Sequence, residues 1–329
     1  MSVAVADRYV SDTPIAILDF ETTGLNAGVD RVVEVSVMRM EPGQNARLVL
    51  DTLVNPERPM AATEIHGITD ADVIEAPVFR DIASDVIRAL SGAVLAAYNV
   101  YFDIRFLQHE LRQAGVAASP PHLCLMYLRP MLDLGPRCRL GEACMAHGID
   151  FTETHIAARD VQASCRLMEI YLREIEQKNI RTFSDLAQLR NYKFVESFFL
   201  PPLTWDDSPR LKTCSHFVSR SGPVGASVTT TSSLVTESGR IEQRPLVVYW
   251  DALKAVIADL EITDEELAHL KLTEERLGLQ PEQVRVLHAR AFASAISQFT
   301  QDQWLDNREA RKLKRLHQCL SALGWAPGE

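Results

Sequence analysis

Apolar runs in the first part of the chain are short and are separated by turn residues. Residues 15–18, 32–40 and 47–54 are apolar or valine-rich, and a Glu-Pro-Gly-Gln-Asn turn separates the last two runs. Short β-rich runs bounded by turn residues are typical of strands. We therefore predict three strands that are joined as a meander.

After the three predicted strands, apolar residues recur at the spacing of a helix. Over residues 79–90 apolar residues recur at helical intervals, and residues 93–97 then have the composition of a buried strand. Further helices are predicted at about residues 102–114, 140–147 and 158–174. This order of elements is typical of a βαβ half, so we predict an α/β domain in which helices pack on a mixed sheet.

The chain changes character in its second half. Residues 206–244 include a Ser- and Thr-rich stretch with almost no large apolar residue, which is typical of a linker. A short hairpin through Val228, Leu234 and Val235 is the alternative. Beyond this stretch the pattern is helical. The predicted parts are a first domain with a C-terminal helical extension over residues 1–205, a linker over 206–244 and an all-α domain over 245–329.

The predicted all-α domain contains an internal repeat. Thr263 followed by Glu266 is a helix-start signature, in which the first side chain caps a backbone amide and the second returns to the cap. Asp306 followed by Glu309 repeats the signature later in the chain. Capping explains these carboxylates, and cation binding is the alternative. The repeat is loosely similar to TerB-like helical domains, and we expect the domain to recruit a protein partner or the substrate.

Composition agrees with two folded domains. Of the 329 residues, 47% are hydrophobic and 24% are charged, which excludes a chain that is disordered throughout. The six cysteines form neither a zinc-ribbon spacing nor a secreted disulfide framework. Because there is no export signal and no apolar run of about 20 residues, we expect a cytoplasmic protein without a membrane span.

The charge balance restricts how the chain could bind a polyanion. The sequence has 34 Lys and Arg against 44 Asp and Glu, for a formal net charge of −10. This balance disfavours nucleic-acid binding through a broadly basic surface. Binding of phosphates through bound cations stays open.

Two carboxylates lie two residues apart at the end of the first predicted strand. Asp19 and Glu21 belong to the sequence Asp-Phe-Glu-Thr-Thr-Gly and would point to the same side of a strand. Adjacent anions repel each other unless a cation lies between them, so the pair favours a divalent metal site. Two solvated acids at a strand end are the alternative.

Two further places hold acids at predicted sheet ends. Asp103 follows the second buried strand at a helix start, where an acid also commonly stabilises the helix dipole. His155 precedes Asp160 by five residues at the front of a later helix. An exposed histidine and an acid in a first helical turn are the alternative there. Nevertheless, it is rare by chance for one sequence to place an Asp-x-Glu motif, a further Asp and a His-x4-Asp motif at sheet edges.

These motifs resemble those of the DnaQ-like, or DEDDh, family of 3′-to-5′ exonucleases. Residues 19–24 are similar to the family's first motif, residues 99–103 to its second and residues 155–160 to its third. Residues 55–69 are also similar to the segment that follows the third strand in proofreading members. The resemblance covers about residues 12–175. It implies an RNase H-like α/β fold, with a mixed five-stranded sheet and flanking helices.

The resemblance also implies a metal site and its ligands. Asp19, Glu21 and Asp160 would hold one magnesium or manganese ion. Asp19 would also contact a second ion, which Asp103 completes directly or through water. Two such ions stabilise the attacking and the leaving oxygen of a phosphodiester displacement. His155 would take a proton from the attacking water as the general base.

Contacts to the terminal nucleotide are implied as well. The residues concerned are Thr22, Thr23, Leu25, His66 and Asn99. The alternative for the two threonines is a turn, and for His66 it is a loop cap. The family often has histidine where this chain has Tyr98, so a contact made by that imidazole is not expected here.

We therefore predict a metal-dependent exonuclease that releases nucleoside 5′-monophosphates from the 3′ end of single-stranded or frayed DNA. The first alternative is an exoribonuclease, because the same metal site cleaves both polymers. The proofreading-like residues 55–69 favour DNA. The second alternative is a recruitment module that has kept the fold without the chemistry, and the presence of all five motif residues argues against it.

Overall fold

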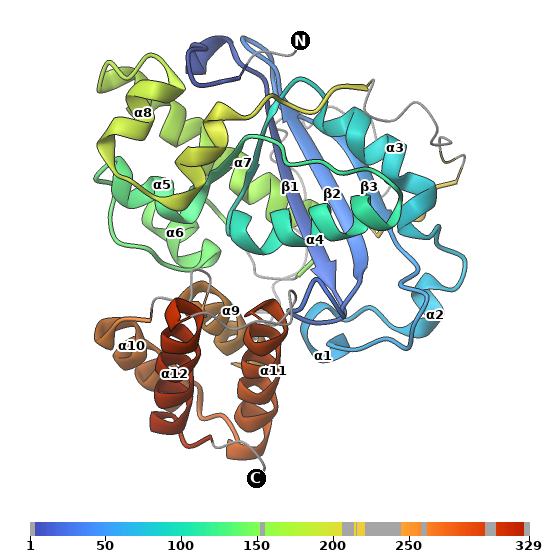
Figure 1. Cartoon of the computed structure of the whole chain (residues 1–329), viewed down its shortest axis with the longest axis vertical. Helices are drawn as coiled ribbons and strands as arrows, with labels where there is room; N and C mark the ends of the chain where they lie inside the picture. Colours follow the sequence, from blue (N-terminus) through green and yellow to red (C-terminus); the bar gives the residue numbers. More distant parts are fainter. Residues whose placement is uncertain are drawn as a thin grey trace. The chain divides into compact units, whose positions relative to one another are not determined.

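The computed structural model describes residues 4–151, 155–205, 214, 216–220, 245–257, 262–299 and 307–325 (Figure 1). The chain divides into two compact units. The first comprises residues 1–21, 32–60 and 68–241, and the second comprises residues 22–31, 61–67 and 242–329. The second unit therefore combines two short segments from the first part of the chain with the C-terminal helices.

A five-stranded mixed sheet forms the centre of the first unit. Its strands are β1 (Ile15–Thr22), β2 (Val32–Met40), β3 (Arg47–Leu53), β4 (Val94–Ala97) and β5 (His122–Cys124). They lie in the order β3-β2-β1-β4-β5. β1, β4 and β5 are parallel to one another, whereas β2 and β3 pair antiparallel. The sheet confirms the predicted RNase H-like α/β fold, including the three-stranded meander.

Helices cover both faces of this sheet, and Figure 1 shows α3 and α4 on one face and α7 on the other. The helices of the first unit are α2 (Asp70–Val73), α3 (Phe79–Leu90), α4 (Val100–Gln113), α5 (Leu125–Met131), α6 (Leu140–Ala146), α7 (Ala157–Gln177) and α8 (Phe183–Leu189). Short 3-10 turns span Val10–Asp12 and Lys193–Phe199. The apolar side chains of α3 that recur at helical spacing are buried, which confirms the helix predicted over residues 79–90.

The strand sequences explain why β1 lies in the middle. Its Ile-Ala-Ile-Leu run is buried along its whole length, as expected for a strand covered on both faces. β3 lies at the end of the sheet, and its first residues are exposed or half-buried. The fifth strand has only three residues, His122–Cys124, and directly precedes α5. A run that short carries little periodicity, so no residues could be assigned to it from the sequence.

Part of the predicted linker is ordered within the first unit. Residues 216–220 lie inside the predicted linker 206–244, yet Val218, Ser219 and Arg220 form hydrogen bonds with residues of β2 and β3. These residues therefore belong with the sheet. The alternative hairpin through residues 228–235 lies outside the described residues.

Beyond residue 244, the described part of the second unit consists of helices and short connecting turns. It contains α9 (Pro245–Ile257), α10 (Asp264–Leu277), α11 (Pro281–Phe299) and α12 (Asn307–Ala322), and also the single turn α1 (Thr63–His66). Thr263 caps α10 by accepting a hydrogen bond from the Glu266 amide at 3.2 Å, and the Glu266 carboxylate accepts one from the Thr263 amide at 2.9 Å. This confirms the capping interpretation of the first signature. Asp306, which begins the second signature, lies outside the described residues.

An apolar cluster holds the second unit together. It joins side chains of α9 to α12, among them Tyr249, Leu287 and Leu316, to Ala62 and Ile65 of the 61–67 segment. Glu64 in the same segment pairs with Arg290 of α11 at 2.8 Å. The 61–67 segment is thus attached to the C-terminal helices by both apolar packing and an ion pair.

Over the described ranges, each helix is either too short or too polar to cross a bilayer. All six cysteines are free thiols.

We predict that the second unit loses stability as the pH falls from about 6.5 to about 4. His288 is fully buried, with its Nε2 2.7 Å from the hydroxyl of Tyr249, and burial lowers its pKa from 6.5 to about 4. The unfolded chain therefore takes up a proton in this window that the folded unit does not, which favours unfolding. Thermal unfolding at a series of pH values measures the loss. A His288→Asn variant should lose less over the same window, and identical pH dependence in both proteins would contradict the prediction.

Candidate active site

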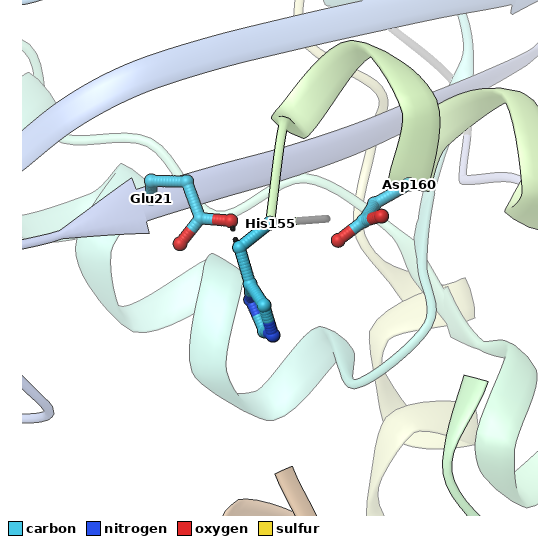
Figure 2. Close-up of side chains that lie close together, drawn as sticks. All are labelled: Glu21, His155 and Asp160. Carbon is cyan, nitrogen blue, oxygen red and sulfur yellow. Dashed lines mark ion pairs between the residues drawn. The ribbon is translucent and has the colours of Figure 1, made fainter. Parts of the chain in front are cut away.

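Three of the predicted site residues lie together in the first unit. Glu21 comes from the end of β1, His155 lies two residues before α7, and Asp160 lies in the first turn of α7. Their candidate ligand atoms all lie within 4.8 Å of one another, and each residue is less than a tenth exposed. Figure 2 shows the three side chains close together, and Nδ1 of His155 lies 3.5 Å from Oε1 of Glu21.

Asp103 lies beside the same point of β1. It is buried in the first turn of α4, and its Oδ1 accepts a hydrogen bond from the backbone amide of Phe20 at 3.2 Å. Phe20 lies between Asp19 and Glu21 in the chain. This bond therefore holds the Asp103 carboxylate beside the part of β1 that carries both acids. Asp103 of the second motif therefore lies beside the strand that carries the first motif.

Asp19 is half-buried and precedes Glu21 by two residues within β1. Side chains two apart in a strand point to the same face. Among the described residues, the group close enough to share one ion consists of Glu21, His155 and Asp160, and it includes neither Asp19 nor Asp103. The structure thus brings three of the five motif residues into one cluster and places the other two on or beside the same strand.

The backbone of His155 has an unusual conformation. Its φ is 46°, in the left-handed region that non-glycine residues rarely adopt. The carbonyl of His155 accepts a hydrogen bond from Nη2 of Arg220 at 2.9 Å. Arg220 in turn binds the carboxylate of Glu34 through Nε at 2.9 Å and Nη2 at 2.5 Å. Arg220, held by Glu34 of β2, thus supports the backbone conformation of His155.

Glu34 and Arg220 are site-supporting residues that the sequence analysis missed. Glu34 is fully buried in β2, and its Oε2 also accepts a hydrogen bond from the amide of Ala157 at 3.1 Å. Burial raises the pKa of Glu34, and the bonds with Arg220 and Ala157 oppose that rise. A charged residue inside a valine-rich strand was the one available signal. Nothing in the sequence indicated Arg220 as its partner.

The threonines that follow Glu21 form bonds within their own loop. Thr22 donates its hydroxyl hydrogen to the carbonyl of Gly24 at 2.6 Å, and the hydroxyl of Thr23 lies 3.2 Å from Asp30 Oδ1. A Cβ at Gly24 would overlap the Asp30 carboxylate, which would have to move. These bonds are the ones expected of turn residues, which was the alternative interpretation of Thr22 and Thr23.

The remaining predicted contact residues lie in different surroundings. Leu25 is half-buried and packs against the apolar cluster of the second unit. His66 is buried in α1, with Nε2 3.2 Å from the carbonyl of Ala61. Asn99 caps α4 through its backbone, and its side-chain Oδ1 is buried without a hydrogen-bond partner in the described part of the chain. Their roles at a nucleotide stay predictions.

Tyr98 occupies the position at which the family often has histidine. Its hydroxyl donates a hydrogen bond to the carbonyl of Cys138 at 2.7 Å, and burial raises its pKa well above 10. The phenol therefore links the end of β4 to the segment before α6. It serves as a neutral hydrogen-bond donor in the protein interior.

Comparison with known proteins shows which proteins this region resembles. A family model described as "Exonuclease" matches residues 16–168, a range that contains all five motif residues. The DNA polymerase III subunit epsilon-like protein of Rhodobacter capsulatus is 39% identical over 198 residues, which cover 57% of this chain and 28% of that protein. The PolC-type DNA polymerase III of Bacillus subtilis is 29% identical over 191 residues, covering 56% of this chain and 13% of the polymerase.

The chain thus spans less than a third of the length of either curated relative. Among solved structures, exonuclease I of E. coli in complex with a dA16 oligonucleotide aligns with 50% of this chain and 42% of its own, at 18% identity and a TM-score of 0.43. The family match and the sequence relatives agree with the motif resemblance. Residues 16–168 of this chain are similar to exonuclease domains, and this similarity agrees with the DnaQ-like motifs.

Proposed function

We propose that the chain is a metal-dependent 3′-to-5′ exonuclease that releases nucleoside 5′-monophosphates from single-stranded or frayed DNA. The observation that carries the proposal is the cluster of Glu21, His155 and Asp160, which lies at motif positions inside the exonuclease match. The names of the two sequence relatives support DNA as the substrate. One is a PolC-type DNA polymerase III, and the other is a DNA polymerase III subunit epsilon-like protein. The proofreading-like residues 55–69 support the same choice.

The donor set fits magnesium or manganese. Glu21 and Asp160 offer carboxylate oxygens in a buried cluster, and hard divalent cations prefer such ligands. We assign one ion to Asp19, Glu21 and Asp160, and a second to Asp19 and Asp103. Bound cations would supply the positive charge that stabilises the scissile phosphate, which the net charge of −10 does not.

His155 is the proposed general base. A neutral imidazole can take a proton from the water that attacks the terminal phosphate. Nδ1 of His155 faces Glu21, so we place the proton transfer at Nε2, on the other side of the ring. Glu21 and the fixed backbone would then orient the ring during the transfer.

Digestion of labelled oligonucleotides tests the proposal. The full chain should shorten 5′-labelled single-stranded DNA progressively and release labelled mononucleotide first from 3′-labelled DNA, in magnesium or manganese only. Asp19→Ala should reduce cleavage to the EDTA background, and His155→Ala should slow it by about 100- to 10,000-fold. Asp81→Ala, which changes an exposed acid of α3, should cleave like the unaltered protein.

The same assay separates the alternatives. Faster digestion of a matched RNA oligonucleotide would replace the DNA substrate by RNA. An absence of cleavage by the folded, metal-loaded chain would contradict the enzymatic proposal. It would then favour the recruitment module, with a protein partner bound by the helices of the second unit.

A second prediction separates the metal role of Asp103 from its structural role. Asp103→Asn keeps an oxygen that can accept the Phe20 hydrogen bond but removes the charge, so we expect an unchanged thermal midpoint and a loss of cleavage. Asp103→Leu leaves a buried amide without that acceptor and should lower stability by about 1–3 kcal/mol. Thermal unfolding and digestion of both variants measure the two effects. Full activity of Asp103→Asn would show that its carboxylate binds no required ion.

A further inference from the structure

Val218 and Ser219 bind to β3 at the edge of the sheet. The carbonyl of Val218 accepts a hydrogen bond from the amide of Leu53 at 2.6 Å, and the amide of Val218 donates to Oγ1 of Thr52 at 3.1 Å. Ser219 donates to the buried carboxylate of Asp51. β3 lies at the end of the sheet, so these bonds occupy an edge that would otherwise present unpaired groups.

This attachment brings Arg220 to the buried Glu34. The guanidinium binds both carboxylate oxygens of Glu34, a bidentate geometry that fixes its orientation as well as its charge. The Glu34 side chain is only 1% exposed, and the Arg220 side chain is 22% exposed. A carboxylate this deeply buried is strongly destabilising when its partner is removed, so the pair constrains the segment that carries Arg220.

The pair also holds the backbone on both sides of Ile156. Arg220 donates from Nη2 to the carbonyl of His155 at 2.9 Å, and Glu34 accepts from the amide of Ala157 at 3.1 Å. The enclosed stretch contains the left-handed conformation of His155 and the first residue of α7. Backbone in such a sparsely populated region persists when the surrounding contacts enforce it.

We infer that Arg220, bound to Glu34, is a positioning residue that fixes the backbone of His155 and so sets the place of its imidazole beside Glu21. The inference rests on the proposed role of His155 and adds a requirement for a residue outside the matched segment 16–168. Arg220 contacts the His155 carbonyl rather than its ring. Its loss therefore shifts the general base and leaves its chemistry intact.

Steady-state kinetics on the full chain test this inference. Arg220→Gln should lower kcat by about 10- to 100-fold, the effect expected of a displacement of about 1 Å in a catalytic group. KM should change little, because Arg220 contacts the backbone carbonyl of His155 and not its imidazole ring. Arg80→Gln is the matched control, since Arg80 makes a bidentate pair with Glu57 at 3.0 and 3.1 Å that is exposed to solvent. It should keep the kcat of the unaltered protein.

Two further variants distinguish positioning from stability. Glu34→Gln with Arg220→Gln leaves no buried unpaired charge, so this double variant keeps the protein folded if the single variant does not. Arg220→Lys keeps a positive charge for Glu34 but lacks the forked guanidinium that also reaches His155. We expect it to restore the thermal midpoint more fully than kcat. Parallel recovery of both quantities would overturn the positioning role.

A spectroscopic measurement keeps this test separate from that of the proposed function. Carbon-13 labelled histidine gives a ring resonance for His155, which a His155→Gln variant identifies. The double variant should shift this resonance, whereas Arg80→Gln should not. If the unaltered chain cleaves no substrate, the proposed function fails and the resonance still tests the placement. An unchanged His155 resonance, or an unchanged kcat in a chain that cleaves, overturns the inference.

Discussion

One buried ion pair, between Glu34 and Arg220, supports the candidate active site. A carboxylate that is fully buried in the middle of a sheet costs free energy unless opposite charge and hydrogen bonds compensate for it. Glu34 finds its partners in a chain segment beyond the exonuclease match and in the first turn of α7. β2, α7 and residues 216–220 therefore meet at a single point, and that point adjoins the backbone of His155.

The charges next to this pair also bear on the metal proposal. Glu21, Asp103 and Asp160 are each less than a tenth exposed, and buried carboxylates repel one another when ionised. The charge of Arg220 is already opposed by Glu34 through two short bonds. A cation between Glu21 and Asp160 would relieve the remaining repulsion. This balance favours a metal site over the alternative of solvated acids at a strand end, since the acids of the cluster are buried.

Local patterns predicted the parts of the molecule that local forces determine. The apolar run before Asp19 and the spacing over residues 79–90 were sufficient for β1 and α3. The convergence of Glu21, His155 and Asp160 followed from motif resemblance, because periodicity does not say which sheet ends meet. The Glu34–Arg220 pair spans 186 residues and joins a valine-rich strand to a segment with linker composition. Neither residue carries a local signal for the other, so only the folded structure shows the pair.

The residues predicted to contact a nucleotide differ in whether their side chains already have partners within the protein. The hydroxyls of Thr22 and Thr23 already bond within their loop, and Leu25 packs against the apolar cluster of the second unit. His66 is buried in α1, beside the carbonyl of Ala61. Asn99 differs, because its buried Oδ1 accepts no hydrogen bond from any described residue. A buried amide oxygen without a donor is costly, and a donor on a bound nucleotide or an ordered water would remove that cost. Among the five residues implied by the resemblance, Asn99 is therefore the one with a buried side-chain acceptor that no described residue satisfies.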